Sequence, residues 1–183
     1  MAVAAFVLAW NCCFAMTDSE LQAYVQGLIP KIVSAAKGGG KGGVKAVADV
    51  IEKNADLQYS AKYAIGSAWK DMNLEKRKAY FEAYKAYVLN KYAGAFVEIV
   101  KSSTITVQGA QGDSVTLMVT DKAGKQTKVF VKCRSKDGAQ ILFYDAIVEG
   151  LSFLQAQRQE FTSMIEKSGV DGLVAFLVSH SGK

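Results

Sequence analysis

YDAIVEGLSFLQAQRQEFTSMIEKSGVDGL, residues 144–173, is the stretch of this sequence that decides its fold. An apolar strand passes through Gly150 into a long amphipathic helix, and neither part contains a catalytic or metal-binding signature. Lys167 before Gly169 is the pairing of a cation and a glycine that is typical of a helix end, and residues 170–178 predict a short final helix. We interpret this segment as a wall built around something apolar.

One cation interrupts the apolar stripe of the long helix. The stripe recurs at spacings of three and four and consists of Leu151, Leu154, Arg158, Phe161 and Ile165. A cation on an apolar face is costly unless it is paired. Arg158 is therefore expected either to form a salt bridge with Asp145 or Glu149, or to contact the head group of an anionic ligand.

Upstream of this segment the apolar residues alternate, which predicts strands. The alternating runs are Ile105 and Val107; Val115, Leu117 and Val119; Val129, Val131 and Cys133; and residues 141–148. Turn residues at 109–113, 121–124 and 137–138 separate the runs and predict short hairpin connections. The result is a four-stranded antiparallel meander with one polar face (Thr116, Thr120, Lys128, Lys132) and one apolar face.

Residues 16–101 show helical periodicity instead. Thr17 and Glu20 form a capping box that opens a helix expected to reach about residue 36 and to bend at Pro30. The glycine-rich residues 38–43 predict a flexible connector, and further helices are predicted at 44–54, 57–70 and 74–100. Helices that cover the apolar face of a curved sheet make an α+β fold.

Residues 1–15, MAVAAFVLAWNCCFA, carry no charged side chain and end in Cys13-Phe14-Ala15, which fits an A-x-A-like cleavage site. We expect a signal peptide cleaved after Ala15, followed by a single domain over residues 16–183; an uncleaved anchor or a misplaced start codon are the alternatives. The net charge of +5 comes from scattered lysines, which are typical of a solvated face. This pattern favours weak, transient proximity to membranes over nucleic-acid binding.

Groups that could perform catalysis are scarce. The only histidine is His180, near the chain end, and there is no G-x-S-x-G motif. No cofactor is predicted, and no metal site, because with His180 at the chain end such a site would have to be built from carboxylates alone. The glycine-rich stretch lacks Gly-Lys-Ser/Thr at the required spacing, so no P-loop is predicted either. Asp145, beside Tyr144 and four residues from Glu149, is the one candidate general base, with a structural anchor as the alternative. The residues favour binding over catalysis.

Three motifs in residues 144–173 carry a family resemblance. Read in order, they are D-x-x-x-E-G-[VL]-S at Asp145, Glu149, Gly150, Leu151 and Ser152; Q-R-x-E-F at Gln157, Arg158, Glu160 and Phe161; and G-x-D-G-L at Gly169, Asp171, Gly172 and Leu173. With these residues the chain resembles the MlaC or toluene-tolerance family. Weaker agreement extends upstream to about residue 44. The sequence has Ala156 where the family often has Asn, and lacks a Trp in the strand before Asp145.

The resemblance implies a periplasmic phospholipid carrier in a Gram-negative bacterium. Its partners would be an inner-membrane ABC transporter complex with an MlaD-like component and an outer-membrane lipoprotein complex with an MlaA-like component. The implied fold is similar to that of nuclear-transport-factor-two-like proteins, with acyl chains entering a cavity between sheet and helices.

We expect the apolar face of the meander and the helix stripes to line this cavity. The expected lipid-binding residues are Phe81, Tyr84, Val88, Phe96, Val107, Leu117, Val119, Val129, Val131, Phe161 and Ile165. Two alternatives are a small-substrate enzyme of the same broad fold that uses Asp145, and a structural or adaptor protein whose core is filled.

Overall fold

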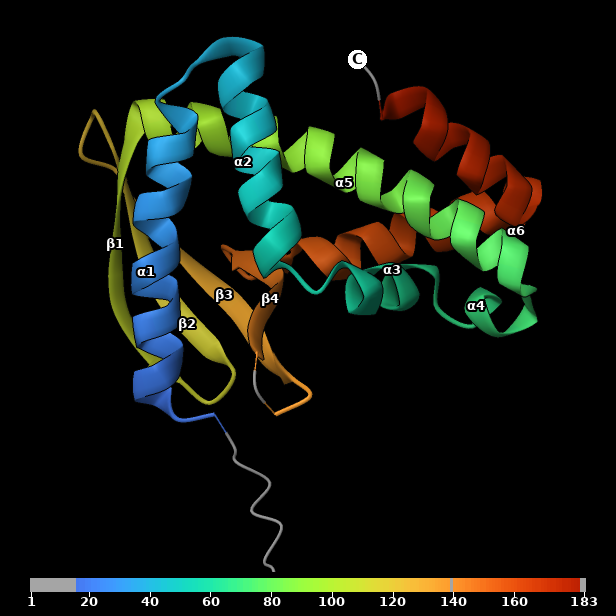
Figure 1. Ribbon diagram of the computed structural model, residues 1–183, viewed down its shortest axis with the longest axis horizontal. Coiled ribbons are helices and arrows are strands. Elements are labelled where there is room, and N and C mark those ends of the chain that lie inside the picture. Colours follow the sequence, from blue (N-terminus) through green and yellow to red (C-terminus); the bar gives the residue numbers. More distant parts are fainter. Residues whose placement is uncertain (1–15, 139, 182–183) are drawn as a thin grey trace, which may run out of the picture.

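The computed structural model describes residues 16–138 and 140–181, so the expected signal peptide lies outside the described residues. Along the chain, a group of helices precedes an antiparallel sheet and one long helix follows it (Figure 1). The elements are α1 (Asp18–Ala36), α2 (Gly40–Asn54), α3 (Leu57–Ile65), α4 (Ala68–Asp71), α5 (Leu74–Ser102), β1 (Ser103–Gln111), β2 (Ser114–Asp121), β3 (Gln126–Lys136), β4 (Gln140–Val148), β5 (Leu151–Ser152) and α6 (Phe153–His180). The α+β fold with a predicted meander is confirmed.

The sheet has the strand order β1-β2-β3-β4-β5, and every neighbouring pair is antiparallel. Val107 pairs with Leu117, and Leu117 with Val129, so these three residues lie on one face, called the inner face here. The predicted turn at 109–113 is too long, because β1 passes a bulge at Gln108 and continues to Gln111. The sequence does not predict β5, a strand of two residues that pairs with the end of β4.

Helix α1 lies along the inner face of the sheet, and α5 and α6 extend away from it with α3 and α4 beneath them (Figure 1). The predicted capping box is present: the Thr17 hydroxyl accepts the Glu20 amide at 3.2 Å, and Glu20 accepts the Thr17 amide at 2.9 Å. Leu21 and Val25 pack from α1 onto Val115, Leu117 and Cys133. The helix continues through Pro30 to Ala36.

Two predictions for the helical half are wrong. The glycine-rich residues 38–43 do not form a connector, because α2 begins at Gly40 and Gly43 is buried against α1. A Cβ atom on Gly43 would lie 3.1 Å from the Ala36 carbonyl oxygen, so the missing side chain lets the two helices approach closely. The helix predicted over 57–70 is split into α3 and α4 at Gly66, whose φ of +62° ends α3.

The predicted closing helix is present, with an interruption at Gly169 and a shorter helical part after it. It begins at Phe153, two residues after Leu151, and Gly169 has a non-helical backbone (φ +70°) that separates its two parts. Phe161, Leu173 and Leu177 from these two parts pack with Tyr80 and Tyr84 of α5 in one buried cluster. None of the helices within the described residues is both long and apolar enough to cross a membrane.

Candidate functional site

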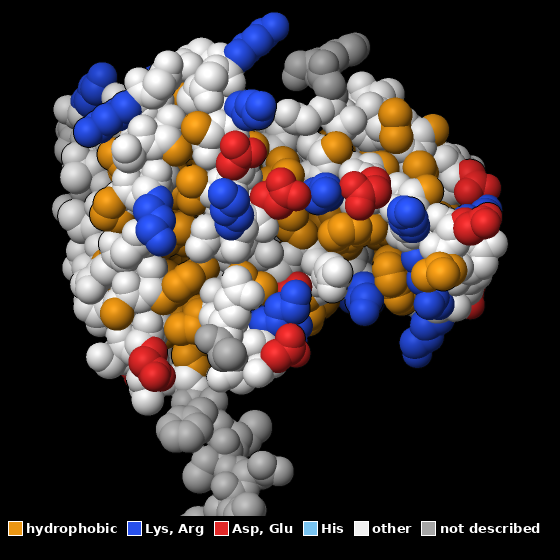
Figure 2. Space-filling model, viewed as in Figure 1, with side chains coloured by type: hydrophobic (Ala, Val, Ile, Leu, Met, Phe, Trp, Pro, Cys, Tyr) orange, Lys and Arg blue, Asp and Glu red, His pale blue; other side chains and the backbone are white. Residues whose placement is uncertain are grey.

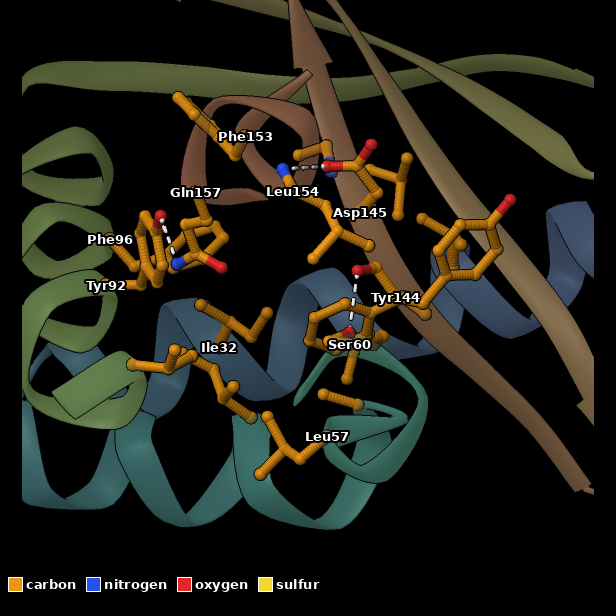
Figure 3. Close-up of a pocket in the computed structure, with 18 of the residues that line it drawn as sticks. Ile32, Leu57, Ser60, Tyr92, Phe96, Tyr144, Asp145, Phe153, Leu154 and Gln157 are labelled. Carbon is orange, nitrogen blue, oxygen red and sulfur yellow. Dashed lines mark hydrogen bonds between the residues drawn. The ribbon is translucent and has the colours of Figure 1, made fainter. Parts of the chain in front are cut away.

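A cavity lies where the sheet, α1, α5 and α6 meet (Figure 3). The empty space in and in front of the cavity, open solvent included, is about 920 Å³. Phe153 lines the cavity and is 39% exposed, so it marks the opening. The other lining residues are Val25, Leu28, Ile29, Ile32, Ile51, Ala55, Leu57, Ser60, Tyr84, Val88, Tyr92, Phe96, Leu117, Val131, Phe143, Tyr144, Asp145, Ala146, Leu154 and Gln157.

The spacing of the lining residues along each helix or strand matches the periodicity of that element. On α5 the lining residues Tyr84, Val88, Tyr92 and Phe96 recur every four residues, which places them above one another on a single helix face. On the sheet, Val131 pairs with Ala146, so these two neighbouring side chains share the inner face. The walls are therefore apolar because several elements turn their apolar stripes toward the same space.

The polar side chains among the lining residues are engaged in hydrogen bonds within the protein. Gln157 is only 4% exposed; its Oε1 accepts the Tyr84 hydroxyl at 3.1 Å, and its Nε2 donates to the Tyr92 hydroxyl oxygen at 3.0 Å. Burial raises the pKa of both Tyr84 and Tyr92 above the ordinary phenol value, so both rings stay neutral. The Ser60 hydroxyl lies 3.0 Å from the carbonyl oxygens of both Asp56 and Tyr144. In the described part of the chain, no buried side-chain nitrogen or oxygen lacks a hydrogen-bond partner.

Asp145 anchors the start of α6 to β4. Its Oδ1 accepts the amides of Ala146 at 2.8 Å and Leu154 at 3.0 Å, and its Oδ2 accepts the Ser152 hydroxyl at 2.5 Å. The Ser152 hydroxyl oxygen in turn accepts the Gln155 amide at 3.0 Å and caps the helix. Both carboxylate oxygens thus accept hydrogen bonds from the fold, which agrees with the structural anchor. Within residues 16–181, apart from residue 139, no group of three or more His, Cys, Asp or Glu could hold a metal ion.

The predicted salt bridge from Arg158 to Asp145 or Glu149 is wrong. The Arg158 guanidinium lies 4.9 Å from the centre of the Tyr63 ring, and its Nη1 donates to the Tyr63 carbonyl oxygen at 3.4 Å. Arg158 is exposed on the outer side of α6 and is not among the lining residues. The buried stripe of α6 uses Leu154, Gln157 and Phe161, so Gln157 occupies the inward position that the sequence assigns to Arg158.

Arg158 can lie across the end of α3 because residue 66 is a glycine. A Cβ atom at Gly66 would lie 3.2 Å from Nη2 of Arg158, and the backbone there has a φ of +62°.

We expect Gly66→Ala to lower the free energy of unfolding by about 1–3 kcal/mol because a side chain is strained in this conformation. Gly94→Ala is the control: Gly94 lies inside α5 with open space around it, so this change should stabilise the fold by about 0.5–1 kcal/mol. Urea denaturation measures both, and equal effects in the two variants would contradict the strain at Gly66.

The expected lipid-binding residues fall into two groups. Tyr84, Val88, Phe96, Leu117 and Val131 line the cavity. The other six lie outside the lining. Phe81, Phe161 and Ile165 belong to the helical cluster around Tyr84. Val107 and Val129 pack against the cluster of Leu21, Val25 and Leu117 on the inner face, and Val119 lies half-buried farther along that face. A role in lipid binding stays a prediction for all eleven, and the geometry favours the five that line the cavity.

The sequence analysis does not predict that α1 lines the cavity. Val25, Leu28, Ile29 and Ile32 of α1 line the cavity, as does Phe153 at its opening. The spacing of Val25, Leu28 and Ile32 signals an amphipathic helix, but it does not indicate which part of that helix is covered by the sheet and which part faces empty space.

Residues 30–179 match the family described as MlaC protein. The chain belongs to the MlaC family. This match runs from the last two turns of α1 to the end of α6 and confirms the resemblance carried by the motifs of residues 144–173. In this MlaC-family chain, the D-x-x-x-E-G-[VL]-S motif supplies the Asp145 and Ser152 pair that joins β4 to α6.

A solved structure has the same fold as this MlaC-family chain. It is the phospholipid-binding protein from Ralstonia solanacearum, determined in complex with a phospholipid. The two chains are 24% identical, the alignment covers 87% of this chain and 96% of that chain, and the TM-score is 0.75. At this level of identity the likeness establishes the shared fold.

Proposed function

We propose that this protein carries one phospholipid, with the acyl chains in the cavity and the head group near the opening at Phe153. The observation that carries this proposal is the lining itself: its side chains are almost all apolar, and its polar side chains are engaged in hydrogen bonds within the protein. Membership of the MlaC family and the phospholipid held by the Ralstonia solanacearum protein of the same fold support it.

The energetics explain why a cavity is sufficient for such a function. Burying one methylene is worth about 0.8 kcal/mol, so two acyl chains with about thirty methylenes cost on the order of 24 kcal/mol to expose to water. A cavity about as apolar as a bilayer makes transfer between membrane and carrier nearly isoenergetic. No nucleophile, metal or nucleotide is needed, so we propose a carrier and not an enzyme.

Membership of the MlaC family supports a cellular compartment and a set of partners for this carrier. We propose that it works in the periplasm of a Gram-negative bacterium and moves lipid between an inner-membrane ABC transporter complex with an MlaD-like component and an outer-membrane complex with an MlaA-like lipoprotein. A cleaved signal peptide over residues 1–15 belongs to the same proposal. Direction of transport then depends on the donor and acceptor complexes, because the cavity itself favours neither.

The two alternatives fit the geometry less well. An enzyme that used Asp145 as its base would employ a carboxylate that already accepts three hydrogen bonds from β4, β5 and α6, which fits a structural role better. An adaptor protein would have a filled core, whereas the cavity lies among Tyr84, Leu117 and Leu154 at the centre of the fold.

Mass spectrometry of the purified protein tests the proposal. Protein isolated from a Gram-negative periplasm and passed through gel filtration should release about one phospholipid per chain on extraction with organic solvent. A periplasmic protein of similar size without a cavity, taken through the same steps, controls for adhering lipid. Recovery of no more phospholipid than from this control would contradict the carrier function.

A further inference from the structure

The outer surface of α3 and its neighbours carries aromatic rings that are each covered by a cation. We define the arginine–aromatic band as Tyr59, Tyr63 and Trp69 together with Arg134, Arg158 and Arg77. Arg134 lies 4.7 Å from the centre of the Tyr59 ring, Arg158 4.9 Å from that of Tyr63, and Arg77 5.3 Å from that of Trp69. The Tyr59 and Tyr63 ring centres are 6.2 Å apart, so the first two pairs adjoin along α3.

The guanidinium groups of the band are held in place before any partner arrives. Arg77 donates from Nε to the Trp69 carbonyl oxygen at 3.1 Å and from Nη2 to that of Lys70 at 3.2 Å. Arg158 donates to the Tyr63 carbonyl oxygen and lies against Gly66, which leaves room for its planar group. Because stacking and hydrogen bonds restrict these side chains in the free protein, little conformational entropy is lost when they bind.

Positive charge on the band is largely unneutralised. Arg134 has Asp56 at 3.6 Å. The other salt bridges among residues 16–138 and 140–181 include neither Arg77 nor Arg158, nor Lys62, whose ammonium lies 5.5 Å from the Trp69 ring centre. Figure 2 shows Lys and Arg side chains beside apolar ones over α3 and α4, at the lower right of that view. A partner of opposite charge would therefore gain attraction without first displacing an acid from these three cations.

The composition of the band indicates the class of partner. Tyr, Trp and Arg are the residues most enriched at the energetic centres of protein interfaces, whereas solvated surfaces are rich in mobile Lys and Glu. Anionic membranes attract flexible polybasic segments as well as rigid ones and do not need guanidinium groups fixed in orientation. A second copy of this chain would bring like charges together. These observations favour a protein whose contact surface is acidic.

We propose that the arginine–aromatic band is a docking surface for an acidic patch on a partner protein. The proposal rests on the proposed function, because the partners available to such a carrier are the components of the two membrane complexes. The band is separate from the cavity, because none of its six residues is among the lining residues.

The test compares two charge reversals of equal size. Lys62→Glu with Arg158→Glu reverses one exposed cation of the band and the exposed lysine beside its Trp69 ring. Lys122→Glu with Lys125→Glu reverses two exposed lysines of the β2–β3 turn as the control. The probes are the purified soluble domain of the MlaD-like component and the purified MlaA-like component from the same bacterium, with binding measured by interferometry. We expect the band variant to bind at least one component about tenfold or more weakly and the control to bind within about threefold of the wild type. Wild-type affinity for that component should fall between roughly 50 and 300 mM salt.

Several results would overturn the proposal. Equal binding by the two variants would remove the band from the interface, and so would weakened binding of the band variant only to vesicles of anionic lipid, which would assign the surface to membranes. A wild-type dimer on gel filtration that the band variant abolishes would assign it to a second copy. Failure of the wild type to bind either component would overturn the proposed partner and the surface together, whereas the lipid content, measured separately, tests the carrier function. Lys62→Gln with Arg158→Gln replaces the reversal if that variant does not fold.

Discussion

Replacing Ala146 with tryptophan is expected to abolish phospholipid retention while the protein stays folded. Ala146 lines the cavity from β4, next to Val131, so the indole ring would extend into space that we assign to acyl chains. Each excluded methylene returns to water at a cost of about 0.8 kcal/mol, so excluding five weakens binding by about 4 kcal/mol, or roughly a thousandfold. Mass spectrometry of extracted lipid should then find less than about a tenth of the wild-type content.

The adjacent residue provides a matched control for this change. Ile147 pairs with Phe130 on the opposite face of the sheet and is not among the lining residues. Ile147→Trp introduces the same ring one residue away, and we expect its lipid content to equal that of the wild type. Circular dichroism melting of both variants separates loss of lipid from loss of fold. Normal lipid content in folded Ala146→Trp would show that the acyl chains lie elsewhere.

Replacing Asp145 with alanine is expected to have the largest effect on stability among single changes at the site. The substitution removes the acceptors of the Leu154 amide and of the Ser152 hydroxyl, and with them the connection between β4 and α6. Loss of a cap costs about 1 kcal/mol and loss of a hydrogen bond to a charged group about 1.5–3 kcal/mol. These two contributions share the same carboxylate and are not fully additive. We therefore expect the free energy of unfolding, measured by urea denaturation, to decrease by about 2–3 kcal/mol.

Two comparisons sharpen the interpretation of that result. Glu149→Gln neutralises an exposed carboxylate in the neighbouring turn, and we expect a change below about 0.5 kcal/mol. A similarly small effect of Asp145→Ala would contradict the anchor. Asp145→Asn keeps the size of the side chain, so a variant that folds, retains lipid and loses an enzymatic activity would instead favour the small-substrate enzyme.

Much of the architecture follows from local pattern. The alternation of Val115 and Leu117, and of Val129 and Val131, is enough to predict strands, because side chains on a strand point to opposite faces in turn. Thr17 and Glu20 start α1 where predicted, and Gly169 interrupts the closing helix, because both depend on backbone groups within a few residues. The glycines at 40–43 are misread, because their low helix propensity is outweighed by close packing of α2 on α1.

The candidate site is less predictable than the fold. The four-residue spacing on α5 correctly brings Tyr84, Val88 and Phe96 into the cavity wall. On α6, Arg158 and Gln157 differ by one position, or about 100° around the helix, and the pattern of threes and fours admits either. Packing against Tyr84 and Tyr92 turns Gln157 inward, and the ring of Tyr63 holds Arg158 outside.

The sequence by itself determined the α+β class, the strand and helix periods, the family motifs of residues 144–173 and the scarcity of catalytic groups. Only the tertiary structure decided which apolar side chains face empty space and which face one another, and that Asp145 binds the start of α6 while Arg158 stacks on α3. The physical reason is that an apolar residue lowers the free energy by leaving water, whichever apolar surface then covers it. Val107, Val129, Leu117 and Val131 on the inner face all pack in the cluster that contains Leu21 and Val25 of α1, but only Leu117 and Val131 also border the cavity. That difference depends on where α1 lies across the sheet, which no local pattern in the sequence specifies.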